Sequence, residues 1–215
     1  MIATVKNILR EIYPFSKTNI NRRKQLNQFK ELLAKNANKP LKVVIGSSQK
    51  FTENWIPSEV HFLNLLDQKD WYKYFEENSI DALLAEHVWE HLTLEQGNIA
   101  ARTCHKFLKK NGRLRVAVPD GFHSDSEYID YVKVGGHGLG ADDHKVLYNF
   151  KSFSEVFSAN GFAVELVEYF DENGTFHANP WNEEDGYIKR SIRYDDRNTD
   201  GNPNYTSLII DAVKI

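Results

Sequence analysis

The sequence predicts an α/β protein built on one open sheet, mostly parallel, with an antiparallel last pair of strands. Short β-branched apolar runs alternate with segments of helical periodicity through the middle of the chain, which is the pattern of βαβ units. The last two apolar runs, 162–171 and 205–215, have no segment of helical periodicity between them. Two strands joined in this way are expected to pair antiparallel.

Hydrophobic periodicity predicts the individual elements. The first strand, Lys42 to Ile45, is a short apolar run that stops at Gly46. In chain order the expected elements are helices over 1–15 and 21–37, strands over 42–45 and 59–63, a helix over 70–79, a strand over 82–85, a helix from 94, a strand over 114–118, a short helix within 123–133, a helix from 153, and the two final strands.

Capping patterns predict where two helices begin and end. Thr93 and Gln96 have capping-box spacing, and the stretch 109–112, Lys-Lys-Asn-Gly, is expected to supply a basic last turn and a stop. Ser152 and Glu155 have the same spacing, with a stop at 160–161.

Two polar segments, 121–149 and 171–204, are too long for ordinary connections, and segments of this length usually act as lids or binding segments or are disordered. We call them the first and second insertions. The expected organisation is an N-terminal helical segment, 1–40, followed by one domain, 41–215, that carries both insertions.

Composition narrows the classes of function. The 215 residues carry a net charge of −3, which gives no electrostatic reason to expect a nucleic acid or an acidic membrane as partner. No segment approaches the roughly 20 apolar residues of a membrane span, and charged residues interrupt the apolar N-terminus. The single cysteine, Cys104, excludes an intramolecular disulfide and fits a reducing compartment, so we expect a cytoplasmic protein.

Several motifs occur in a characteristic order: "VVIGSS" at 43–48, "SIDALLAEHVWEHL" at 79–92 and "CHKFLKKNGRLRVAVPD" at 104–120. Together they resemble the class I S-adenosylmethionine-dependent methyltransferases, which have a Rossmann-like, doubly wound sheet. The resemblance covers roughly residues 41–170 and the final strand, and the piece from EHVWEHL to VPD is its specific part. The sequence has Ser48 where the family usually has a second glycine.

The resemblance implies S-adenosylmethionine as cofactor, bound across the carboxyl ends of the strands. It implies that a glycine loop holds the methionine part of the cofactor, that a carboxylate after the second strand accepts hydrogen bonds from the ribose hydroxyls, and that the end of the "DALLAEH" run faces the methionine end. The implied cofactor-binding residues are Gly46, Ser47, Ser48, Glu59, Asn64, Glu86 and His87.

Methyl transfer requires an in-line approach of the acceptor and sometimes a base. The predicted catalytic residues are Asp120, His87 and His144. Asp120 also fits a plain turn before Gly121, and His91 fits a packed or capping histidine.

The glycine-rich stretch 135–144 is the most unusual in the chain. Its His137, Asp142, Asp143 and His144 are residue types that bind zinc, manganese or iron, but no compact motif such as HExxH is present, and we predict no metal site. We expect His137, Asp143 and Trp181 to contact the substrate. The aromatic and basic residues around Trp181 fit packing on the sheet equally well.

The leading functional hypothesis is a methyltransferase that acts on a small molecule or a cell-envelope precursor, with a homodimer as one expected assembly. The alternative is a non-catalytic protein that uses the same fold to bind the cofactor or a partner. A third hypothesis is a metal-dependent hydrolase built on the 137–144 loop.

Overall fold

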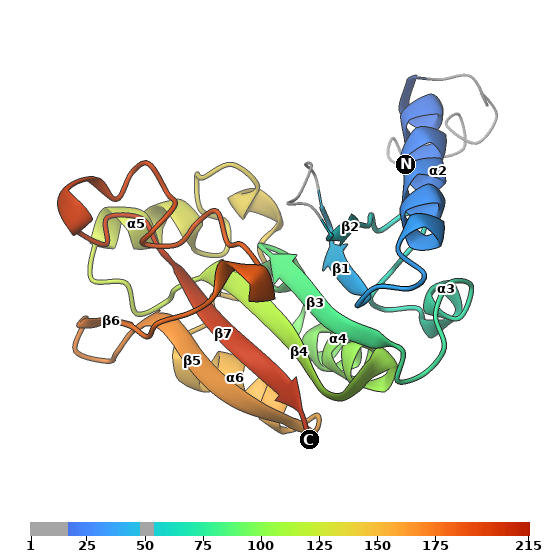
Figure 1. Cartoon of the computed structure of the whole chain (residues 1–215). Coiled ribbons are helices and arrows are strands. Elements are labelled where there is room, and N and C mark those ends of the chain that lie inside the picture. Colours follow the sequence, from blue (N-terminus) through green and yellow to red (C-terminus); the bar gives the residue numbers. More distant parts are fainter. Residues whose placement is uncertain (1–16, 48–53) are drawn as a thin grey trace.

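The computed structural model describes residues 17–47 and 54–215. The expected helix over 1–15 lies outside these ranges. The described chain forms a seven-stranded sheet in the order β2-β1-β3-β4-β7-β5-β6 (Figure 1). The strands are β1 (Lys42–Ile45), β2 (Ile56–Pro57), β3 (Ile80–Glu86), β4 (Leu108–Pro119), β5 (Phe162–Phe170), β6 (Phe176–Ala178) and β7 (Ser207–Lys214).

Strand directions confirm the predicted fold class. The first four strands are mutually parallel. β7 enters between β4 and β5 and runs antiparallel to both, as expected of the last pair, so β5 points the same way as β4. β6, which the sequence did not predict, adds an antiparallel hairpin at the edge.

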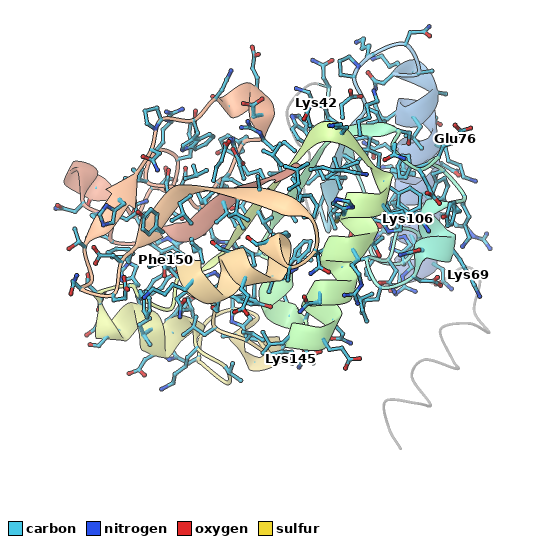
Figure 2. The ribbon with its side chains drawn as sticks, turned by 90° about the horizontal axis from the view of Figure 1, so that it is seen from below. Lys42, Lys69, Glu76, Lys106, Lys145 and Phe150 are labelled. Atoms are coloured by element: carbon cyan, nitrogen blue, oxygen red, sulfur yellow. The ribbon has the colours of Figure 1, made fainter. Side chains whose placement is uncertain are left out.

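The two faces of the sheet differ in chemistry because side chains alternate along each strand. On one face Leu83, Ala85 and Val116 are fully buried and belong to the large apolar core. The helices α4 (Leu94–Phe107) and α6 (Phe150–Ser158) lie against each other across this face (Figure 2).

The opposite face carries a smaller apolar cluster that includes Leu84 and Ile209, together with the buried charges Arg115 and Asp211. Ile188 of the second insertion belongs to the same cluster. The second insertion therefore covers this face, where a doubly wound fold would have helices.

The helix α2 (Lys17–Lys35) confirms the helix expected over 21–37. Its Phe29 is fully buried, with ring centroids 4.9 Å from Phe62 and 5.1 Å from Tyr74. This helix is therefore packed into the main core, and the division of the chain at residue 40 stays a prediction.

The structure confirms one predicted capping box and corrects the other. Thr93 and Gln96 cap α4 reciprocally, as expected. The box that starts α6 joins Asn149 to Ser152, because the Asn149 side chain accepts the N–H groups of Lys151 and Ser152. The helix therefore begins three residues before the predicted position.

Three further expectations about the elements were wrong. Helix α4 ends at Phe107, and 108–112 already belong to β4, where Leu108 pairs with Ile80. The strand expected over 59–63 is a turn, since β2 ends at Pro57. The helix expected over 70–79 is one turn, α3 (Gln68–Trp71), whose first N–H groups are capped by Asp67.

The short helix in the first insertion is confirmed as α5 (Ser126–Val132). Within the described ranges, no helix has the length and apolar character needed to cross a membrane. Figure 1 shows both insertions lying toward the end of the sheet where β3 and β4 terminate, in yellow-green and in orange to red.

Candidate functional site

The order of the strands reverses at β1, which has β2 on one side and β3 on the other. In open α/β sheets, ligands bind outside the carboxyl ends of the strands at such a switch point. Gly46 stands there with φ +65°, and a β-carbon on it would lie 3.0 Å from Cγ2 of Val88. The position therefore requires glycine both for its backbone and for its space.

Ser47 is held by the sheet rather than by a loop. Its N–H donates to the carbonyl of Ser58 at 2.9 Å, and the Ser58 hydroxyl donates to the carbonyl of Val44 at 2.8 Å. The Ser47 N–H is thus engaged in the extension of the β1–β2 pair, where the sequence suggested a ligand contact. Ser48 lies outside the described residues.

Glu59 follows β2 and is half-buried, and burial raises the pKa of its carboxyl. Its Oε1 accepts a hydrogen bond from Nε2 of Gln25 at 3.2 Å. Asn64 has a turn role, because its side-chain oxygen accepts the N–H of Leu66 at 2.9 Å and its carbonyl accepts Nε1 of Trp71 at 2.9 Å. Of the two, Glu59 has a carboxylate oxygen with no hydrogen bond in the described residues, and its cofactor role stays a prediction.

Glu86, the last residue of β3, fastens the second insertion. Its carboxylate accepts the backbone N–H of Arg190 at 2.8 Å and that of Lys189 at 3.2 Å. The structure therefore gives this carboxylate a partner within the chain.

His87 follows β3 with φ +55°, an unusual conformation for a residue with a β-carbon. Its Nε2 lies 3.0 Å from Oγ of Ser207, and its Nδ1 lies 2.8 Å from Oε1 of Glu90. These distances are those of a nucleophile–base–orienter series, but Ser207 is 1% exposed, so a substrate has no access to its hydroxyl. The contacts orient the His87 ring instead.

Asp120 closes β4 and is fully buried. Its Oδ1 accepts the N–H of Phe122 at 2.9 Å, and its Oδ2 accepts the N–H of Phe170 at 2.7 Å. Burial raises the pKa of Asp120 to about 6, against the opposing effect of those two hydrogen bonds. The geometry matches the turn role that the sequence left open, and a catalytic role stays a prediction.

His144 meets two residues that the sequence did not connect with it. Its ring lies 5.0 Å from that of His91, and Glu90, His91 and His144 bring one possible metal-ligand atom each within 4.8 Å of one another. Glu90 is 1% exposed and His144 is 7% exposed. The hydroxyl of Tyr148 belongs to the same surroundings, since burial, and after it the charge of Glu90, raises the pKa of Tyr148 to about 12.

The predicted substrate residues lie in different surroundings. His137 is exposed, with its ring 5.2 Å from that of Tyr131. Asp143 is exposed, and its Oδ2 lies 3.5 Å from Nδ1 of His91. The ring of Trp181 packs over the guanidinium of Arg115 at 4.8 Å, on the face of the sheet that the second insertion covers.

Sequence reasoning missed Glu90 as a site residue, and it favoured a packed or capping role for His91 over its role as a candidate base. The available signal was the repeated Glu-His pair, at 86–87 and at 90–91. The sequence could not show that the first insertion folds back on the second pair. In the structure Lys145 does so, donating its N–H to the carbonyl of Glu90 at 2.7 Å.

No protein-family model matches the sequence, and no curated protein matches it. Among solved structures, the chain is similar to an S-adenosylmethionine-dependent methyltransferase of Archaeoglobus fulgidus, with 15% identity over 93% of this chain and 100% of that one and a TM-score of 0.44.

Another similar structure is an S-adenosylmethionine-dependent methyltransferase of Thermotoga maritima, with 13% identity over 89% of this chain and 87% of that one and a TM-score of 0.46. A third is phosphoethanolamine N-methyltransferase 2 of Haemonchus contortus in complex with S-adenosyl-L-methionine, with 14% identity over 87% of this chain and 52% of that one and a TM-score of 0.43. Similarity at this level carries no conclusion about the activity of the chain.

Proposed function

We propose that the protein is an S-adenosylmethionine-dependent methyltransferase that acts on a small molecule or a cell-envelope precursor. The observation that carries the proposal is the pair of features at the switch point. Gly46 takes a positive φ at the end of β1, and the half-buried carboxylate of Glu59 follows the neighbouring strand β2. They stand in the places that the sequence motifs assign to the methionine part and the ribose of the cofactor.

The residues present fit this group. Gly46 adds no side chain of its own at the end of β1, although Cγ2 of Val88 packs beside it. Glu59 offers two oxygens to a pair of neighbouring hydroxyls, and only Oε1 has a contact, with Gln25, within the described residues. When bound, S-adenosylmethionine supplies an electrophilic methyl group on sulfur.

We propose that His87 takes the proton of the acceptor on Nε2, once this nitrogen leaves the hydroxyl of Ser207, from which it lies 3.0 Å. Its ring is partly exposed, and it stands at the end of β3, the strand next to β1. Glu90 fixes the orientation of this ring through Nδ1. His137 and Asp143, exposed on the first insertion, are the proposed substrate contacts. The net charge of −3 favours a substrate other than a nucleic acid.

The test is calorimetric titration of the protein with S-adenosylmethionine and S-adenosylhomocysteine, with NAD as a control ligand. We expect saturable one-site binding of the two sulfur compounds and no binding of NAD. Glu59→Ala should lower the affinity by about 1.5–3 kcal/mol for each charged hydrogen bond lost. Gln25→Ala is the matched control, because it removes the same internal contact and leaves the carboxylate in place.

Unchanged affinity in a folded Glu59→Ala variant would show that the ribose assignment is wrong. Absence of binding by the wild-type protein would reject the proposal. Binding of both sulfur compounds without turnover across a broad panel of acceptors would favour the non-catalytic alternative.

A further inference from the structure

Glu90, His91 and His144 form a compact group in which three buried polar atoms have no hydrogen bond of good geometry within the described residues. Within the described residues, neither carboxylate oxygen of Glu90 accepts a hydrogen bond of good geometry, although Oε1 lies 2.8 Å from His87. Nδ1 of His91 is likewise buried without a hydrogen bond in that part of the chain. Buried polar groups are rarely left in this state, and each case calls for an explanation such as an ion or a water molecule.

The ring of His144 is prepared to bind through Nε2. Its Nδ1 lies 2.7 Å from the carbonyl of Val132, which can only accept, so Nδ1 carries the proton. The lone pair is then on Nε2. A histidine that binds a metal usually donates its other N–H to a backbone carbonyl or a carboxylate in this way.

The backbone holds the two segments of the group together. The N–H groups of Lys145 and Val146 both donate to the carbonyl of Glu90, at 2.7 and 3.3 Å. Gly140, with φ +85°, provides the left-handed turn of the first insertion beside His91, and a β-carbon there would lie in ordinary contact with Cε1 of that ring, at 3.8 Å. The backbone contacts do not involve the three side chains, so the two segments are held together whether or not these side chains bind an ion.

We propose that Glu90, His91 and His144 bind a divalent transition-metal ion, of which zinc is the best fit. Two imidazoles and one carboxylate suit zinc, iron or manganese, whereas calcium and magnesium prefer oxygen ligands throughout. Three protein ligands leave a position open for water or for an oxygen atom of a ligand. The site differs from the set His137, Asp142, Asp143 and His144 that the sequence suggested, and it shares only His144 with that set.

The separations between the three candidate ligand atoms show how far the side chains must move to bind one zinc ion. Ligand atoms at about 2.0–2.2 Å from one zinc ion are about 3.3–3.6 Å apart in a tetrahedral site. The three atoms lie within 4.8 Å of one another. A contraction of up to about 1.5 Å, within reach of side-chain rotation, is therefore enough.

Asp143 is a neighbour of the site rather than a fourth member of the group. Its Oδ2 lies 3.5 Å from Nδ1 of His91, but its side chain is 66% exposed and its Oδ1 is paired with Lys145 at 2.8 Å. We assign it an outer contact. The proposal does not depend on the proposed cofactor, and it is compatible with His87 as the proton acceptor because Glu90 has a second oxygen.

The test is titration of the EDTA-treated, dialysed full chain with zinc chloride by calorimetry, with the bound metal counted by elemental analysis. We expect one zinc ion per chain. Glu90→Gln, His91→Ala and His144→Ala should each lower the affinity by at least about 100-fold, because the loss of an outer-shell partner alone costs about 10–100-fold. His137→Ala, a histidine exposed on the same insertion, is the matched control and should bind as the wild type does.

A second measurement uses the wild-type protein and therefore does not depend on whether the variants fold. Cobalt chloride should give visible absorption bands of a four- or five-coordinate ion, and zinc should abolish them stoichiometrically. Zinc should also raise the melting temperature of the wild type and of His137→Ala, since a ligand that binds the folded state stabilises it. No stoichiometric binding, or binding that persists in Glu90→Gln and His144→Ala, would overturn the proposal.

Discussion

The two insertions differ in how their polar groups are paired. Three buried or nearly buried charges of the sheet fasten the second insertion, since Glu86, Arg115 and Glu168 all bond to its backbone or to Trp181. The first insertion instead brings His144 to Glu90 and His91, whose buried polar atoms have ionic neighbours but no hydrogen bond of good geometry in the described chain. Two polar segments of similar length therefore have opposite characters.

The difference indicates which insertion has a structural role. A polar network whose members are all satisfied stabilises one conformation of the chain, whereas an unsatisfied buried group costs free energy unless something binds it. We therefore regard the second insertion as a cover of the sheet and the first as the ligand-facing segment. Departures from local consistency in a folded protein are expected at functional sites.

Arg115→Met should have the largest effect on stability. The guanidinium donates to both oxygens of Asp211 at 2.7 Å and to the carbonyls of Asn182 and Gly186 at 2.9 and 2.7 Å. Its loss leaves a buried carboxylate without its main partner, which typically costs about 3–5 kcal/mol. Denaturation in urea, followed by circular dichroism, measures the change.

Two control variants distinguish the stability loss that comes from breaking the buried Arg115–Asp211 pair from the loss that comes from removing any arginine. Arg113→Met removes the 32% exposed arginine that bonds the same Asp211 at 2.8 Å, and it should cost about 1 kcal/mol or less, because Arg115 still pairs with both carboxylate oxygens. Arg115→Met combined with Asp211→Leu should recover most of the loss, because no buried charge then remains unpaired. A loss in Arg115→Met no larger than that in Arg113→Met would contradict the structural role of the second insertion.

Asp120 directly precedes the first insertion and accepts the N–H of Phe170, which directly precedes the second. It should make the free energy of unfolding depend on pH. Its pKa is raised by burial to about 6, from 3.8 when unperturbed. A carboxyl with a raised folded pKa contributes stability below its unfolded pKa and loses it as pH rises through the folded value. Between pH 4 and 7 the wild type should therefore lose about 2 kcal/mol that Asp120→Asn does not lose.

The comparison is the difference in slope between the two proteins, measured by urea denaturation at several pH values. Other groups titrate equally in both and cancel. Identical slopes would mean that Asp120 is charged at little cost, and would revive its predicted role as an accessible base.

The fold was predictable because the sequence signals of its strands and helices are local. The pairing of buried polar groups was not predictable, because it depends on distant segments of the chain. Alternating apolar residues such as Leu83 and Ala85 identify a strand with two faces, and Thr93 with Gln96 identifies a helix start. Arg115, by contrast, reads as an exposed residue of a strand until Asp211 and the second insertion are known to enclose it. Contacts of that kind depend on chain segments far apart in sequence.

The candidate site was predictable in part for the same reason. Gly46 and Glu59 were expected as cofactor residues from the resemblance, and the structure places them after β1 and β2, although the strand expected over 59–63 is a turn and the cofactor role of both stays a prediction. The group of Glu90, His91 and His144 was not expected, because the return of the first insertion over Glu90 has no signal in the local pattern. His144 was proposed as a site residue, but with other neighbours.

Trp181→Phe should have a moderate effect and sharpen the assignment of the second insertion. The Nε1 of Trp181 donates to Oε1 of the fully buried Glu168 at 3.0 Å. Its removal leaves that oxygen without its donor and should cost about 1–2 kcal/mol. The expected substrate contact would appear as a raised KM for the acceptor, once an acceptor is known, in protein that remains folded.

The matched control is Tyr194→Phe, in the same insertion. Its hydroxyl donates to the exposed carboxylate of Glu183 at 2.5 Å, so the same kind of bond is removed in contact with water. We expect a loss below about 0.5 kcal/mol. Equal losses in the two variants would show that Glu168 is less shielded from water than its burial indicates.

His91→Leu should have the smallest effect and the opposite sign. Leucine has a similar volume and removes a buried polar atom whose one reported contact in the described residues is the exposed carboxylate of Asp143, at 3.5 Å. In EDTA the variant should be as stable as the wild type or more stable by up to about 1 kcal/mol, because no satisfied hydrogen bond is lost. Asn149→Ala, which removes a satisfied cap at the end of the same insertion, should cost about 1 kcal/mol in the same assay. A variant of His91 that is clearly less stable than the wild type would mean that this ring is part of the protein's own packing, and the contrast between the insertions would then have to rest on Glu90 and His144 alone.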